Sequence, residues 1–113
     1  MDLYTELRQL TDQLEISIKS LRKTGTAYAQ AEKDYKVLLR QECLKLRDEG
    51  MAIGMLTLVC YGIPEVAEAR FKRDVAEATY KANSEAINSI KLRMRLVENQ
   101  LQREWTNTGV GNL

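Results

Sequence analysis

The sequence is poor in the residues that build common metal and redox sites. Its 113 residues include no histidine, two cysteines, six glycines and one proline. Without histidine it lacks the commonest general base and the commonest zinc ligand of proteins. Cys43 and Cys60 cannot form a CxxC motif or supply four metal ligands. Because glycine and proline are the strongest helix breakers, their scarcity favours long helices.

A strong net charge and a long apolar run are also missing. The formal net charge is +1, with 44% hydrophobic and 29% charged residues. A nearly neutral chain has no general attraction to nucleic acid or to a membrane surface, so such binding would need local charge clusters. The uncharged segment 51–63 is shorter than the roughly 20 apolar residues that span a bilayer. We expect a soluble helical protein that does not bind membranes.

Two long segments of nearly equal length, 2–49 and 64–105, carry apolar residues at helical spacing. The first stripe consists of Leu3, Leu7, Leu10, Leu14, Leu21, Tyr28, Tyr35, Leu39, Cys43 and Leu46. The second consists of Val66, Ala69, Ala76, Tyr80, Ile87, Ile90, Met94, Val97 and Leu101. We predict an all-α protein with one domain, 1–105. It is a long antiparallel helical hairpin made of helix 2–49, connector 50–63 and helix 64–105, and a flexible tail follows at 106–113.

Local features of these segments leave some alternatives open. Gly25 costs a helix about 1 kcal/mol relative to alanine, so the first helix either breaks there or passes another helix closely. We favour an unbroken helix.

The connector suits a short apolar helix or a strand, and we favour the helix because a lone strand would have no pairing partner. Asn83 interrupts the second stripe as a register-setting polar residue. The i,i+4 spacing predicts four surface ion pairs: Glu15–Lys19, Glu32–Lys36, Glu68–Lys72 and Glu77–Lys81.

The connector is also a candidate protein interface. Its candidate contact residues are Met51, Met55, Leu56, Leu58 and Tyr61. They form either an exposed apolar tip that docks a partner or a plug buried at the hairpin end or in a homodimer. Because two helices alone bury little surface, we predict a dimer or a higher oligomer.

Basic residues form two candidate nucleic-acid clusters. Folding the chain back near residues 56–57 brings Lys19, Arg22 and Lys23 near Lys91, Arg93 and Arg95. The second cluster, Arg70, Lys72 and Arg73, lies beside Phe71 and Tyr61. Clustered cations can bind phosphates, and aromatic rings can stack on bases. For the first cluster we favour a solvated helix surface. For the second we favour packing of Phe71 under the connector, with Arg70 and Arg73 paired to Asp48, Glu49 and Asp74. A helix–turn–helix over 46–73 is disfavoured because Glu65 and Glu68 would face the DNA.

The sequence presents no catalytic constellation. Its carboxylates alternate with lysines along exposed helical faces, as in solvated helices. We therefore predict that the protein is not an enzyme and uses no cofactor or metal. Asp2, Glu6 and Arg8 argue against a secretory signal in the first ten residues. We expect Cys43 and Cys60 to be reduced thiols in a cytoplasm rather than a disulfide.

Four runs of the sequence are distinctive: GTAYAQAEKDYK (25–36), LRDEGM (46–51), RFKRDVAEATYKAN (70–83) and REW (103–105). Together they resemble a family of small helical proteins of phages and prophages of Gram-positive bacteria. The least generic are the Gly50-Met51 junction and the Arg103-Glu104-Trp105 ending. The resemblance implies an accessory protein of the early phage region, acting in the host cytoplasm near recombination and single-strand-binding functions. It supplies no activity and no catalytic residues.

Two functions follow as hypotheses. The first is an interaction module that binds an unidentified host or phage protein, for example to inhibit a defence system such as CRISPR. Near-zero net charge, the lack of catalytic groups and the apolar connector favour it. The second is a nucleic-acid-binding accessory factor in phage replication or recombination, which the basic clusters favour. The early-region resemblance argues against a virion component.

Overall fold

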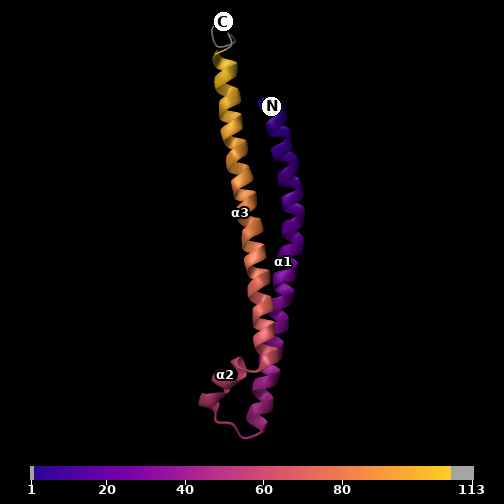
Figure 1. Cartoon of the computed structure of the whole chain (residues 1–113), viewed down its shortest axis with the longest axis vertical. Coiled ribbons are helices and arrows are strands. Elements are labelled where there is room, and N and C mark those ends of the chain that lie inside the picture. Colours follow the sequence, from indigo (N-terminus) through magenta and orange to yellow (C-terminus); the bar gives the residue numbers. More distant parts are fainter. Residues whose placement is uncertain (1, 108–113) are drawn as a thin grey trace. The chain divides into compact units, whose positions relative to one another are not determined.

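The computed structural model describes residues 2–107, which form three α-helices and no strand (Figure 1). They are α1 (Leu3–Asp48), α2 (Ile53–Tyr61) and α3 (Pro64–Asn107). The all-α prediction is confirmed, and the connector is a helix rather than a strand. Thr106 and Asn107 were predicted to belong to a flexible tail, but they continue α3. The rest of that predicted tail, 108–113, lies outside the described residues.

The ends of α1 are set by local hydrogen bonds. The backbone N–H of Thr5 donates to Oδ1 of Asp2 at 2.7 Å, so Asp2 is the N-terminal cap and the pKa of its carboxyl is lowered. At the other end Gly50 adopts φ = 96°, its N–H donates to Arg47 O, and the N–H of Met51 donates to Leu46 O. This is the glycine-terminated turn that ends many helices.

Helix α1 continues without a break through Gly25. A Cβ atom placed on Gly25 would lie 3.3 Å from Cε2 of Tyr80. The glycine therefore provides room for the Tyr80 ring beside the α1 backbone. The favoured prediction of an unbroken first helix is confirmed, and close packing accounts for the glycine there.

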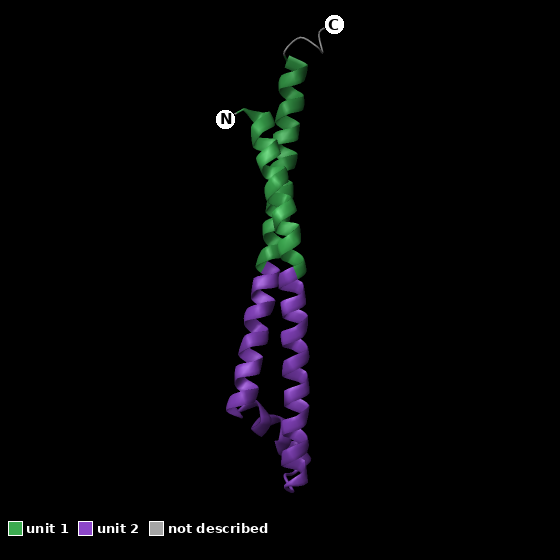
Figure 2. Ribbon diagram, turned by 90° about the vertical axis from the view of Figure 1, so that its right-hand side faces the viewer, with its two compact units in different colours: residues 1–22, 82–113 green, residues 23–81 purple. Residues whose placement is uncertain are grey.

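The chain divides into two compact units (Figure 2). The first unit consists of residues 1–22 and 82–113, of which 2–22 and 82–107 are described. Its buried side chains are Leu10, Ile87 and Val97. Nδ2 of Asn83, which is half-buried, donates to the backbone oxygen of Ser17 at 3.1 Å. A polar residue in the apolar stripe thus joins α3 to the α1 backbone within this unit.

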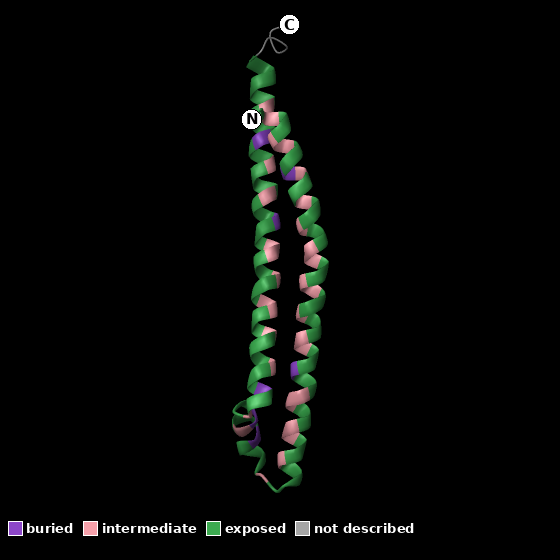
Figure 3. Ribbon diagram, turned by 45° about the vertical axis from the view of Figure 1, so that its right-hand side comes forward, coloured by how far each residue is buried: buried purple, intermediate pink, exposed green. Residues whose placement is uncertain are grey.

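The second unit, 23–81, contains the end of α1, all of α2 and the beginning of α3. Its buried side chains are Tyr35, Leu56, Cys60 and Val66. The Tyr28 and Tyr80 rings lie 5.9 Å apart, and the Arg73 guanidinium lies 4.7 Å from the centre of the Tyr35 ring. Because earlier residues of α1 meet later residues of α3, the two segments run antiparallel in this unit. Buried positions are few and isolated along α1 and α3, and most of the helix surface is exposed (Figure 3).

Candidate interaction surfaces

Helix α2 has no charged residue and is buried on only one side. Leu56 and Cys60, one helical turn apart, are buried, while Ile53, Met55 and Leu58 are 68%, 51% and 72% exposed. The side chains of Leu56 and Cys60 therefore anchor α2 and leave the opposite side apolar and open to solvent. We call Ile53, Met55, Leu58 and Tyr61 the α2 surface.

The five predicted contact residues of the connector have different environments. Met55, Leu58 and Tyr61 are exposed, Met51 is half-buried, and Leu56 is buried. The connector thus combines features of the exposed tip and of the plug. Ile53 belongs to the α2 surface but was not among the candidates. The exposure of Ile53 follows from the burial of Leu56 and Cys60 on the other side of α2. Sequence periodicity could not predict which side is exposed, because the segment is apolar on all sides.

Two thiols lie side by side where α2 meets α1. Sγ of Cys43 donates to Sγ of Cys60 at 2.7 Å, and neither cysteine is in a disulfide. Burial of Cys60, together with this contact, raises the pKa of its thiol to about 11. A neutral thiol buried in this way packs as a small apolar group.

The cationic cluster at 70–73 is only partly available to a ligand. The guanidinium of Arg73 lies over Tyr35 and forms ion pairs with Asp74 at 2.9 Å and Glu32 at 3.9 Å. Its hydrogen bond with Asp74 raises the pKa of Arg73. Arg70 lies 5.3 Å from the centre of the Tyr61 ring. Lys72 is exposed.

The favoured prediction for this cluster was right for Arg73 and Asp74 but wrong for its neighbours. Phe71 is 62% exposed rather than packed under the connector, because it lies on the solvent side of α3. Arg70 stacks on Tyr61, and neither Arg70 nor Arg73 pairs with Asp48 or Glu49 within residues 2–107.

All six cations of the first predicted nucleic-acid cluster are exposed. In the first unit they are Lys19, Arg22, Lys91, Arg93 and Arg95, and Lys23 belongs to the second unit. None of them forms an ion pair with another residue of the described part of the chain. These side chains are free to contact an external anion.

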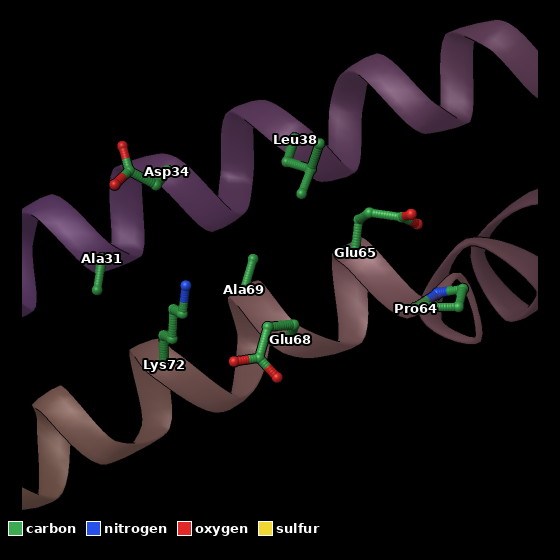
Figure 4. A pocket seen from close by; sticks show the side chains of 8 residues that line it. All are labelled: Ala31, Asp34, Leu38, Pro64, Glu65, Glu68, Ala69 and Lys72. Atoms are coloured by element: carbon green, nitrogen blue, oxygen red, sulfur yellow. The ribbon is translucent and has the colours of Figure 1, made fainter.

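Two of the four predicted helical ion pairs form. Lys36 pairs with Glu32 at 3.2 Å and Lys81 pairs with Glu77 at 2.7 Å. Within the described range 2–107, Glu15–Lys19 and Glu68–Lys72 form no ion pair, so those predictions were wrong. The side chains of Glu68 and Lys72 point in different directions (Figure 4). Hydration of exposed charges competes with such pairs, which are each worth only a few tenths of a kcal/mol.

A groove of about 520 Å³ lies between α1 and α3 of the second unit (Figure 4). Its apolar lining includes Ala31 and Leu38 from α1 and Ala69 from α3, which project into the space between the helices. Its charged lining consists of Asp34, Glu65, Glu68 and Lys72. We call it the acidic groove. The sequence analysis missed this groove because it depends on residues from two helices.

A second groove in the same unit, of about 360 Å³, has the opposite charge. Its apolar lining is Leu39, Cys43, Leu44 and Leu56. Its charged lining is Lys36, Arg40 and Arg47, with no carboxylate. We call it the basic groove. Spacing along α1 could have suggested its cations, since Lys36 and Arg40 are one turn apart.

Comparison with protein-family models, with curated proteins and with solved structures found no match to this chain. The resemblance to the phage family therefore stays a prediction. Across residues 2–107, no helix combines the length and apolar character needed to cross a membrane. The same residues contain no group of three or more histidine, cysteine, aspartate or glutamate side chains placed to hold a metal ion.

Proposed function

We propose that the protein is a non-enzymatic interaction module that binds a partner protein through the α2 surface. The observation that carries this proposal is the exposure of Ile53, Met55 and Leu58 on a helix without charge, anchored by Leu56 and Cys60. Methionine and leucine side chains adapt to the shape of a partner and release ordered water on contact. Tyr61, held under Arg70, adds an aromatic group of the kind enriched at interaction hot spots.

The sequence resemblance supports a setting for this activity. We propose that the protein is a phage accessory factor in the host cytoplasm, and that its partner is a host or phage protein, for example a component of a defence system such as CRISPR. We also propose that the chain forms a long antiparallel hairpin and self-associates. Antiparallel contacts within the second unit support the hairpin. The exposed apolar side chains of the same unit support self-association.

A capture experiment with paired substitutions tests the α2 surface. Tagged protein is expressed in infected cells, and co-purified proteins are identified by mass spectrometry. Replacing both Met55 and Leu58 by serine should abolish capture of any specific partner, because it removes the centre of the apolar surface. A matched control replaces Leu92 and Leu96 by serine, since these leucines are 54% and 59% exposed in the first unit. Equal capture by both double variants would refute the proposed surface.

A second function, nucleic-acid binding, is favoured by one observation. Arg22, Lys91, Arg93 and Arg95 are exposed and carry no ion pair among residues 2–107. Replacing these four residues and Lys23 by glutamine should then reduce retention on single-stranded DNA and flatten its dependence on salt. Unchanged retention would leave the cluster as a solvated surface.

A further inference from the structure

The acidic and basic grooves face different sides of the second unit. Both use α1: Asp34 and Leu38 line the acidic groove, whereas Lys36, Arg40 and Leu44 line the basic groove. Successive residues of an α-helix are about 100° apart around its axis, so Asp34 and Lys36 project in nearly opposite directions. One molecule therefore presents a negative groove on one side of this unit and a positive groove on the other.

Two charged side chains in each groove form no ion pair within the described residues. Glu65 and Glu68 of the acidic groove form no ion pair among residues 2–107, and the same holds for Arg40 and Arg47 of the basic groove. Internal pairing would have satisfied them at little cost, because ion pairs do form elsewhere on these helices. These four side chains are available to an external surface of opposite charge.

The apolar linings of the two grooves also differ in side-chain size. Leu44 is 55% exposed and belongs to the basic groove, with Arg40 one turn before it and Arg47 one turn after it. In the acidic groove, Ala31 and Ala69 leave space between α1 and α3 (Figure 4). A leucine between two cations matches a small-residue hollow bordered by carboxylates.

We propose that the occupant of each groove is a second copy of this chain, with the basic groove of one copy docked on the acidic groove of the next. The proposal deepens the proposed function, because it rests on the self-association included there and names the surfaces involved. A partner with only a cationic segment would match the charge of the acidic groove alone, whereas a second copy of this chain matches the charges of both grooves. The contact joins different surfaces, so each docked copy keeps one free groove. Assembly then continues past the dimer into a ring or an open array.

Charge reversal with rescue tests this contact. The acid-reversed variant carries Glu65→Lys and Glu68→Lys, and the base-reversed variant carries Arg40→Glu and Arg47→Glu. Molar mass is measured by light scattering over a range of protein concentrations at low and high salt, after circular dichroism has confirmed the helix content. The wild type should form oligomers that dissociate as salt rises. Each variant alone should be monomeric.

Two rescues separate loss of complementarity from damage to the fold. An equimolar mixture of the two variants should associate again, and so should one chain that carries all four reversals. Lysines in the first turn of α3 oppose its helix dipole, so a second acid-reversed variant, Asp34→Lys with Glu68→Lys, serves if the first fails to fold. The matched control Leu92→Ser should retain the wild-type mass.

Three results would overturn the proposal: a wild type that is monomeric at every concentration, reversed variants that keep the wild-type mass, or a mixture that stays dissociated. The capture experiment on the α2 surface is repeated with the charge-reversed variants, beside the wild type and the serine variant of Met55 and Leu58. If partner capture persists in a monomeric wild type, self-association and the groove contact have failed, while partner binding through the α2 surface stands. If self-association behaves as described but serine at Met55 and Leu58 leaves capture intact, the proposed function alone has failed.

Discussion

At the scale of single residues, the Tyr80 ring limits the size of the side chain that position 25 can hold. The edge of Tyr80 approaches the position that a Cβ atom would take to 3.3 Å, and the same ring lies 5.9 Å from Tyr28. A methyl group needs the ring to move by a few tenths of an ångström. A longer side chain would push Tyr80 away from Tyr28 and open the contact between α1 and α3 in this unit.

Small and large side chains at position 25 should therefore have very different effects on the free energy of unfolding. Gly25→Ala should change the free energy of unfolding by less than about 1 kcal/mol, because helix propensity and crowding oppose each other. Gly25→Leu should lower it by about 2 kcal/mol through overpacking. Urea titration followed by circular dichroism measures both. A leucine variant as stable as the wild type would show that Tyr80 does not constrain this position.

Cys60 should react slowly with alkylating agents. Its pKa is raised from 9.0 to about 11, so at pH 8 its thiolate fraction should be roughly 100-fold below that of the unfolded chain. Iodoacetamide labelling followed by mass spectrometry, with and without denaturant, checks this. Equal labelling rates in the two conditions would contradict the burial of this thiol.

The same shift predicts a change of stability with pH. Because the pKa is higher in the folded state than in the unfolded state, Cys60 favours folding fully below pH 9, and this contribution falls as the pH rises from about 9 to about 11. Other groups titrate in this range, so the comparison is with Cys60→Ala. The alanine variant should lose less stability than the wild type between these pH values.

At the scale of helices, two valines of α3 have opposite environments. Val66, in the first turn, is fully buried, while Val75 is 49% exposed. Val66→Ala should lower the free energy of unfolding by about 2 kcal/mol, because it removes buried methyl groups and leaves a cavity. Val75→Ala should change it by less than about 0.5 kcal/mol. Thermal melts of both variants give the comparison, and equal effects would show that the first turn of α3 is not anchored.

The sequence predicted the helices better than the surfaces. Apolar spacing is a local signal, so the extents of α1 and α3 followed from it to within two residues at each end. The orientation of α2 could not follow, because no polar side distinguishes Leu56 and Cys60 from Ile53 and Leu58. Spacing predicted the pair Glu68–Lys72 as readily as Glu32–Lys36, but hydration and side-chain direction decide which pair forms.

At the scale of the whole molecule, a net charge of +1 conceals a separation of charge. Composition argued against electrostatic binding, yet the second unit carries two grooves of opposite sign. Their charges cancel in the sum over the chain. The grooves could not be predicted without knowing which residues of α1, α2 and α3 meet.

The proposed hairpin makes a direct prediction for the whole chain. Spin labels at Tyr4 of α1 and Gln102 of α3 should report a separation of about 2 nm within one molecule, given interhelical distances of 8–10 Å and the reach of the labels. Dilution with unlabelled protein removes contributions from neighbouring copies. A separation of many nanometres after dilution would rule out the hairpin.

Because the buried positions along α1 and α3 are isolated, short stretches of each helix can unfold locally. Leu10, Ile87 and Val97 in one unit and Tyr35 and Val66 in the other are buried, and the helix positions around each of them are half-buried or exposed. Opening one turn exposes little apolar area, so brief local melting is inexpensive and does not require the rest to unfold. Amide protons should accordingly exchange with deuterium in a graded series along each helix rather than all at one rate.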